Sequence, residues 1–138
     1  MDLEIESSRW FEEAEYDPEA AVDASASGRY NWACFISQQA AEKAVKAVYI
    51  RRGEDVERVH SIMALLKGDA PRGLKGIGEL GDLLEDASEL DRQYIPTRYP
   101  NGVPYGKPYE FYTQKKAKEC IDCARKLIEA CRKILRPT

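Results

Sequence analysis

Apolar residues recur at helical spacing along most of the chain. The strongest pattern covers residues 30–52, where apolar side chains return every three or four positions and mark one face of an amphipathic helix. Gly28 and Gly53 bracket this segment, as glycines often do at helix ends. The same spacing predicts another helix over residues 117–135, with Pro137 placed after it as a stop signal.

The first segment, residues 3–26, is helical in composition but contains Asp17-Pro18. Proline removes one backbone donor from a helix and clashes with the preceding turn. Two arrangements fit this sequence: one long helix kinked at Pro18, or two helices with Asp17 capping the second. We expect the single long helix.

The rest of the chain alternates helical segments with connections rich in glycine and proline. Residues 80–94 predict a further long helix that ends before Pro96, and residues 61–67 predict a short one. Residues 68–78 are a connection, and residues 95–108 contain four prolines that forbid a regular element. A loop with its own aromatic residues is usually functional or packed on the body of the protein, so we expect one of these roles for residues 95–108.

These segments predict a single all-α domain over residues 1–138, an up-and-down antiparallel helical bundle of four long helices plus a short one. Charged residues make up 33% of the chain and hydrophobic residues 43%, a balance that excludes a disordered chain. No apolar run approaches the roughly 18 residues that cross a bilayer, and residues 1–9 are acidic rather than a basic signal-peptide start. We therefore expect a cytoplasmic protein that does not bind membranes.

Charge is distributed unevenly. Residues 1–27 hold nine acids and one base, whereas residues 114–138 hold eight bases and three acids. These runs predict either two neighbouring helices with solvated faces of opposite sign, or a basic stripe that meets RNA or an acidic partner. The first interpretation is the more common one for charge runs, and the formal net charge of −3 argues against a dedicated duplex-binding protein.

The strongest helix carries polar residues on its apolar side. Gln39, Lys43 and Lys46 are four and three residues apart, so they share a face. Their long side chains can pass the edge of the core, with Glu42 and Lys46 forming a surface pair. Alternatively, the lysines line a pocket for an anionic ligand such as a nucleotide phosphate. The spacing alone favours neither.

His60 is the only histidine, which excludes a metal site built from several histidines. A histidine at a helix start is commonly a cap or a core residue, but it becomes a general acid or base when a cation such as Arg58 lies beside it. Cys120-x-x-Cys123 falls inside a helix and lacks the second ligand pair that a zinc site needs. We expect no metal and no cofactor.

Four groups of residues occur in register along the chain. They are Trp10-(x)3-Ala14-(x)2-Asp17-(x)3-Ala21, the run Gln-Gln-Ala-Ala-Glu-Lys-Ala-Val-Lys-Ala at 38–47, His60-Ser-Ile, and Tyr94 with Arg98-Tyr99-Pro100. Together they resemble the HEPN domain family from about residue 10 to residue 135. The resemblance implies an up-and-down bundle that forms a homodimer. It also implies a small nucleotidyltransferase protein as partner, in a two-gene system of the toxin–antitoxin kind.

Many HEPN proteins are metal-independent ribonucleases whose motif has four to six residues between an arginine and the histidine that follows it. In this chain, the positions at that spacing before His60 hold Gly53, Glu54 and Asp55. Arg58 is too close to His60, and Arg52 is one residue too far. An acid at this position would repel the scissile phosphate instead of binding it. The ribonuclease motif is therefore absent.

What remains resembles the branch of non-catalytic, nucleotide-binding companions of nucleotidyltransferases. The residues that the resemblance assigns to nucleotide or phosphate binding are Lys43, Lys46, His60, Tyr94, Arg98 and Tyr99, and it assigns none to catalysis. One alternative is a ribonuclease toxin in which His60 works with Arg98 or Arg52. A second is a purely structural dimeric scaffold, in which Lys43 and Arg98 bind carboxylates or backbone carbonyls and no cavity is open.

Two expectations concern packing. The prolines around Arg98, Tyr99 and Pro100 should hold this loop in order against the bundle, with Arg98 paired to Glu42 or Asp91. The apolar surface on several helices also exceeds what one four-helix core needs, which favours a homodimer.

Overall fold

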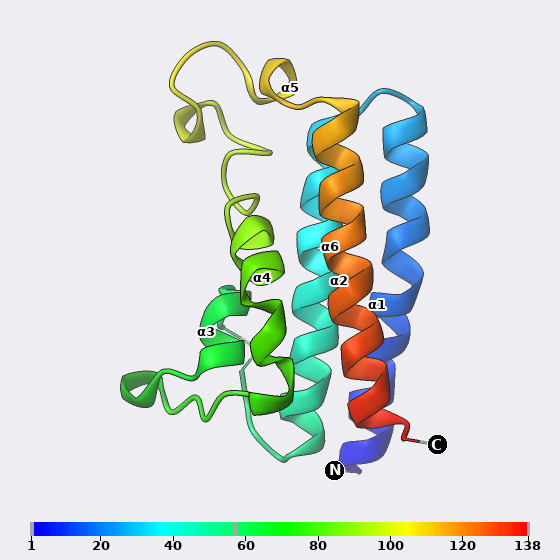
Figure 1. Ribbon diagram of the computed structural model, residues 1–138, viewed down its shortest axis with the longest axis vertical. Coiled ribbons are helices and arrows are strands. Elements are labelled where there is room, and N and C mark those ends of the chain that lie inside the picture. The colour runs from blue at the N-terminus through cyan, green and yellow to red at the C-terminus, as the bar shows by residue number, and fades with distance from the viewer. Residues whose placement is uncertain (1, 57, 138) are drawn as a thin grey trace.

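Three long helices form the body of the protein (Figure 1). The structure is a computed structural model that describes residues 2–56 and 58–137. The long helices are α1 (Leu3–Ala26), α2 (Tyr30–Arg51) and α6 (Gln114–Leu135). The shorter ones are α3 (Ile62–Lys67), α4 (Leu84–Asp91) and the single turn α5 (Pro108–Phe111). No strand element occurs in the described ranges, so the predicted all-α class is confirmed.

The helices alternate in direction, as an up-and-down bundle requires. In Figure 1, α1 and α4 run one way, whereas α2 and α6 run the other. Helix α2 lies between its neighbours and packs on both α1 and α6. Its alanines Ala33, Ala40, Ala44 and Ala47 are fully buried, and their small size lets the neighbouring helices approach closely. Across residues 2–56 and 58–137, none of the helices combines the length and apolarity that crossing a membrane demands.

Helix α1 is a single helix through Pro18, as expected from the sequence. Its first turn is capped by Asp2, whose carboxylate accepts hydrogen bonds from the backbone amides of Glu4 (2.9 Å) and Ile5 (3.2 Å). Pro18 is buried against the bundle, so packing offsets the helical hydrogen bond that proline cannot donate. Gly28, at φ +80°, ends the helix and lets the chain turn back into α2.

The fourth helix of the bundle is shorter than the sequence pattern predicts. Gly78–Leu83 forms a 3₁₀ helix, and only Leu84–Asp91 is α-helical. Gly78 and Gly81 weaken the α-helix at its start, because glycine loses the most backbone entropy on ordering. After Asp91 the chain continues as turns, and Pro96 cannot supply a helical donor.

The buried side chain of Tyr49 helps to fix the connection at residues 68–77. The buried Tyr49 hydroxyl donates to the carbonyl of Leu65 (2.7 Å) and accepts from the amide of Gly76 (2.8 Å). Burial raises the pKa of Tyr49, so the hydroxyl keeps the proton that it donates. Gly76 has φ +82°, and a Cβ there would lie 2.9 Å from the carbonyl oxygen of Lys67, so the position requires glycine.

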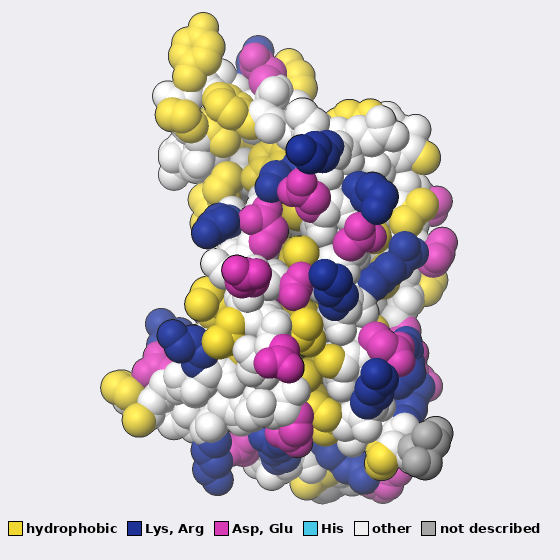
Figure 2. Space-filling view, viewed as in Figure 1, with side chains coloured by type: hydrophobic (Ala, Val, Ile, Leu, Met, Phe, Trp, Pro, Cys, Tyr) yellow, Lys and Arg dark blue, Asp and Glu magenta, His cyan; other side chains and the backbone are white. Residues whose placement is uncertain are grey.

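The acidic first helix and the basic last helix lie side by side. Glu15 pairs with Arg132 (2.8 Å) and Arg136 (3.4 Å), and Glu19 approaches Arg125 to 3.6 Å. Figure 2 shows dark blue and magenta side chains interspersed along α6 rather than a continuous basic surface. The structure thus bears out the interpretation of neighbouring helices with faces of opposite charge.

The loop after α4 is anchored at its start and at its end. Thr97 is fully buried, its hydroxyl donates to the carbonyl of Gln93 (2.6 Å), and its own carbonyl accepts from Asn31 of α2 (3.0 Å). At the other end, the Tyr112 hydroxyl donates to the amide oxygen of Gln93 (2.7 Å). Between the anchors, residues 99–111, which include α5, project from the bundle (Figure 1), and we call them the arm.

We expect the Tyr112 anchor to make stability fall in alkaline solution. Burial, followed by the nearby thiols of Cys34 and Cys120, raises the pKa of Tyr112 to about 12, whereas an unfolded tyrosine titrates near 10. The contribution is complete below about pH 10 and is lost as the pH rises through about 12, because the unfolded state gives up its proton first. Urea unfolding at about pH 9 and about pH 11 measures the loss. Tyr112→Phe should show a shallower decline, and an equal decline in both proteins would contradict this assignment.

Candidate functional site

A row of buried polar side chains follows one face of α2. Gln38, Glu42 and Lys46 are only 0%, 5% and 2% exposed, and they are spaced four residues apart. The Gln38 amide donates to Glu42 Oε1 (3.0 Å), and Lys46 Nζ lies 3.1 Å from Glu42 Oε2. The surface pair expected of Glu42 and Lys46 is therefore wrong: α1 and the segment before α3 cover α2 here, and the pair is buried.

The two lysines expected to share a ligand have separate carboxylate partners. Lys43 turns towards α1 and binds Asp17 at 2.8 Å, with about a third of its side chain exposed. Lys46 pairs with Glu42 within its own helix. Gln39, the third residue of the expected face, donates to the side-chain oxygen of Gln38 (2.7 Å). The face exists, but its charges are arranged in pairs.

His60 lies at the exposed edge of the buried row. Its Nδ1 is 3.4 Å from Glu42 Oε2, and its ring stacks on Tyr94 with centroids 4.9 Å apart. About half of the His60 side chain (49%) remains accessible. With Nδ1 against the carboxylate, Nε2 is the ring nitrogen left for a ligand.

Asp91 fixes the segment that carries His60. Its carboxylate accepts from the Ser61 hydroxyl (2.8 Å) and from the amides of Ile62 (2.7 Å) and Met63 (3.1 Å). The Ser61 hydroxyl in turn accepts from the amide of Ala64 (3.1 Å). The Asp91 carboxylate thus binds backbone amides in the first turn of α3 that have no partner within the helix. It also binds the hydroxyl of Ser61, the residue directly after His60.

Among the residues that the structure describes, Arg98 has no acidic partner, contrary to the expected pair with Glu42 or Asp91. Both carboxylates bind other groups, and Arg98 folds back so that Nε and Nη2 donate to the carbonyl of Tyr94. Its guanidinium carbon lies 4.2 Å from the Phe35 ring centroid, 4.7 Å from that of Tyr94 and 5.0 Å from that of Tyr99. The loop does pack on the bundle at Arg98, but Tyr99 and Pro100 are exposed.

We call His60, Tyr94, Arg98, Phe35 and Tyr99 the His60–Arg98 stack. Its groups come from α2, the segment before α3 and the loop after α4. It combines flat π faces with a cation, and Tyr99 is 47% exposed. This set of groups can stack on a planar ring or donate hydrogen bonds to an anion. Sequence reasoning missed Phe35 because it reads as an ordinary residue of the apolar face.

In residues 2–56 and 58–137, no guanidinium is hydrogen-bonded to His60. Arg98 binds the Tyr94 carbonyl, whereas Arg52 donates to the carbonyl of Gly76 (3.1 Å) and lies 3.5 Å from Glu79. A ribonuclease site needs a cation beside the histidine to bind the phosphate, and neither arginine takes that position here.

The cysteines belong to the core. Cys34, Cys120 and Cys131 are fully buried, and all four thiols are free. Burial raises the pKa of Cys131 to about 12, and burial together with Asp86 raises that of Cys123 to about 12, so these thiols stay protonated at neutral pH. Within the described ranges, no three His, Cys, Asp or Glu side chains gather as metal ligands would.

The fold and the stack define a small helical-bundle protein whose polar site lies between the second helix and the loops around α3 and α4. The sequence profile of the HEPN domain matches residues 7–134. The chain belongs to the HEPN domain family.

Two solved structures and one further relative support this membership. The crystal structure of TT1696 from Thermus thermophilus is 38% identical, with a TM-score of 0.80, over 92% of this chain and 96% of that one. ST0689, described as an archaeal HEPN homologue, is 39% identical with a TM-score of 0.75, over 94% and 98% of the two chains. A protein of Methanocaldococcus jannaschii named "Putative toxin MJ1304" is 29% identical over 130 residues, which are 89% of this chain and 84% of that protein.

Proposed function

We propose that this chain is a non-catalytic HEPN module that binds a nucleotide, or the end of a single-stranded RNA, on the His60–Arg98 stack. The observation that carries the proposal is the Arg98 guanidinium over three aromatic rings, one of which stacks on the half-exposed His60. Proteins bind unpaired bases by stacking them on aromatic rings and guanidinium planes. Exposed Tyr99 supplies a ring on which a base can stack.

The charges of the site support a modest role for phosphate. The hydrogen bonds of Arg98 to Tyr94 use Nε and Nη2, so Nη1 can donate to a phosphate oxygen. Lys43 is partly exposed and reaches a phosphate only by leaving Asp17. Lys46 acts through Glu42, which holds His60 in place. In this proposal the base contacts dominate the affinity, and the phosphate contacts weaken with salt.

The module works as a homodimer with a small nucleotidyltransferase partner in a two-gene, toxin–antitoxin-like system. The family resemblance supports the pairing, and the toxin name of the M. jannaschii relative supports the setting. The arm supports association: Tyr105, Tyr109 and Phe111 are 81%, 64% and 45% exposed. Figure 2 shows hydrophobic side chains gathered on this projecting part of the molecule.

A ribonuclease toxin is the second candidate. The geometry of His60 favours it, because a carboxylate at Nδ1 leaves Nε2 in the orientation of a general base. The absence of an arginine at hydrogen-bonding distance from His60 in the described chain argues against it. The paired Lys43 and the carbonyl-bound Arg98 fit the third candidate, a structural scaffold.

Binding of fluorescently labelled short RNA and of free nucleotides, followed by anisotropy, tests the proposal. Tyr99→Ala should lower the affinity for RNA about tenfold, since stacking one base contributes roughly 1–3 kcal/mol. The control is Tyr16→Ala, which removes another exposed tyrosine on α1, far from the stack in sequence, and should leave binding unchanged. Sedimentation of the same samples reports whether the chain is a dimer.

Three results would contradict the module. Cleavage of RNA that disappears in His60→Ala would establish the ribonuclease. Equal binding by Tyr99→Ala and by the unsubstituted protein would show that the ligand does not bind at the stack. If the protein neither binds nor cleaves RNA, whether or not the nucleotidyltransferase is present, only the scaffold candidate remains.

A further inference from the structure

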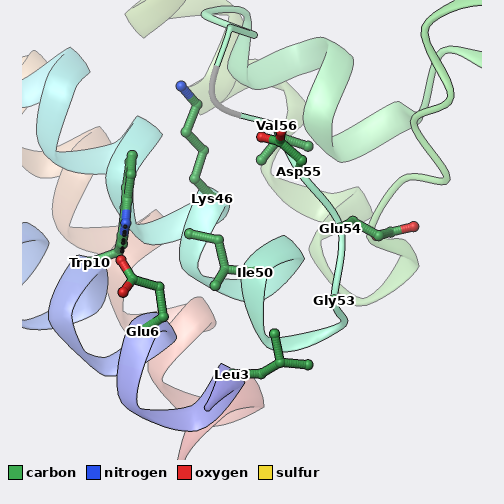
Figure 3. Close-up of a pocket in the computed structure, with 9 residues that line it drawn as sticks. All are labelled: Leu3, Glu6, Trp10, Lys46, Ile50, Gly53, Glu54, Asp55 and Val56. Carbon is green, nitrogen blue, oxygen red and sulfur yellow. Dashed lines mark hydrogen bonds between the residues drawn. The ribbon is translucent and has the colours of Figure 1, made fainter. Parts of the chain in front are cut away.

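Trp32 is an exposed aromatic residue beside the stack that the proposed function does not use. It lies in the first turn of α2 and is 44% exposed, although tryptophan side chains are highly buried on average. The other tryptophan, Trp10, is partly buried at a cavity of about 500 Å³ between α1, α2 and the segment after α2. Figure 3 shows its indole Nε1 bonded to Glu6, at 3.2 Å. Trp10 is thus held by its own helix, whereas Trp32 presents its ring to solvent.

Phe35 connects Trp32 to the His60–Arg98 stack. The two residues are three positions apart on α2, so they share a face of the helix. Their ring centroids are 6.1 Å apart with the planes at 79°, an edge-to-face contact that fixes the orientation of the indole. Phe35 in turn lies 4.2 Å from the guanidinium carbon of Arg98. Trp32 therefore extends the stack along α2.

A buried hydrogen bond fixes the loop of the stack relative to the start of α2. The Asn31 amide donates to the Thr97 carbonyl at 3.0 Å, and both residues are buried. Asn31 directly precedes Trp32, and Thr97 directly precedes Arg98. The indole and the guanidinium are thus held in place before any ligand binds, which lowers the entropy that a ligand loses in ordering them.

The groups follow one another in the order of a nucleic-acid strand. The contacts run from Trp32 through Phe35 and Arg98 to Tyr99, whose ring centroid is 5.0 Å from the guanidinium carbon. Both end rings are exposed, Trp32 to 44% and Tyr99 to 47%, and a cation lies between them. A strand repeats the pattern of base, phosphate and base, and aromatic rings bind successive bases by stacking. A mononucleotide has one base and fills only one of the two rings.

We propose that Trp32 is a second base-stacking residue and that the site takes two consecutive nucleotides of a single-stranded RNA. One base stacks on Tyr99 and its neighbour on Trp32. The phosphate that joins them accepts from Arg98 Nη1, which the bonds to Tyr94 do not use. This inference rests on the proposed function, because it extends the same site, and it selects an RNA strand over a free nucleotide as the ligand.

Titration calorimetry with two adenine probes tests the second base position. Adenylyl-adenosine carries two bases and one phosphodiester, whereas AMP carries one base and a phosphate. We expect the dinucleotide to bind about tenfold more tightly, since stacking a further base contributes that much. AMP has the larger negative charge, so a site that recognised charge alone would prefer AMP. Tyr99→Ala should weaken both probes, because it removes the ring of the proposed function.

Two substitutions of Trp32 separate stacking from apolar bulk. Trp32→Leu keeps an apolar side chain but no ring, and it should reduce the preference for the dinucleotide to about twofold or less while leaving the affinity for AMP unchanged. Trp32→Phe retains a ring and should keep most of the preference. The chain has only two tryptophans, so Trp32 is the single fluorophore in a Trp10→Phe background. Adenylyl-adenosine should quench its emission more strongly than AMP.

The outcomes distinguish this inference from the proposed function. Equal affinities for the two probes, both lowered by Tyr99→Ala, would overturn the second base position and leave the proposed function in place. Binding of neither probe up to about 10 mM would overturn both. A preference that persists in Trp32→Leu would place the second base elsewhere. If Trp32→Leu sediments as a smaller species than the unsubstituted protein, a second copy of the chain covers Trp32, which would also overturn the inference.

Discussion

Replacing Glu42 by leucine should lower the free energy of unfolding by about 3 kcal/mol, because a buried ion pair that loses one member leaves a charge in a poor solvent. Glu42 accepts from the Gln38 amide, pairs with Lys46 at 3.1 Å and holds His60 Nδ1 at 3.4 Å. Lys46 is 2% exposed, so water cannot replace the lost carboxylate without opening the bundle. Urea unfolding at neutral pH measures the change.

The double substitution Glu42→Leu with Lys46→Met separates charge from packing. Both replacements are good helix formers and fill similar volumes. We expect the double variant to regain part of the lost stability, because a buried pair can often be exchanged for apolar groups at little cost, whereas the buried Gln38 amide still lacks its acceptor. A double variant as unstable as Glu42→Leu alone would show that the loss came from cavity or shape rather than from Lys46.

Asp91→Ala should be nearly as damaging, with a loss of about 2–4 kcal/mol. The substitution removes the acceptor for the Ser61 hydroxyl and for the backbone amides of Ile62 and Met63. A partly buried donor that is left without an acceptor destabilises the folded state by its full desolvation cost. The charge of the carboxylate also makes these hydrogen bonds stronger than neutral ones. Thermal and urea unfolding report the stability.

Asp91→Asn is the matched control, since it retains one acceptor oxygen in the same place. Its loss should be about half that of Asp91→Ala, and equal losses would mean that the α3 start depends on the charge alone. Asp91→Ala should also loosen His60, one residue before Ser61, and weaken RNA binding beyond the stability change. Unaltered RNA binding in a folded Asp91→Ala protein would contradict this second effect.

The helices could largely be predicted from the sequence because their apolar faces are continuous. Helices α1, α2 and α6 follow the period of the apolar residues, and the single helix through Pro18 was expected. The fourth helix is shorter because two glycines precede it and turns follow it, local features that the spacing of leucines does not reveal. The apolar period reports which face is buried, not where backbone hydrogen bonding changes.

The sequence indicated part of the stack but not its contacts. Four of the six residues that the resemblance assigns to binding lie together, His60, Tyr94, Arg98 and Tyr99, whereas Lys43 and Lys46 pair with Asp17 and Glu42. The Arg98 partner is a backbone carbonyl, which no side-chain pattern encodes. The burial of Glu42 depends on helices and loops distant in sequence, so the spacing of Glu42 and Lys46 fits a surface pair equally well.

The Tyr49 hydroxyl has a consequence for how the molecule opens. It bonds the end of α3 at Leu65 and the connection at Gly76 at once, and both bonds lie inside the core. If the connection detached alone, this buried hydroxyl would keep its bond to Leu65 but lose the amide of Gly76 that it accepts from. We therefore expect the connection to open together with the contact between α2 and α3. Amide hydrogens of the connection should exchange with solvent as one cooperative unit, more slowly than the many bends of this surface segment would indicate.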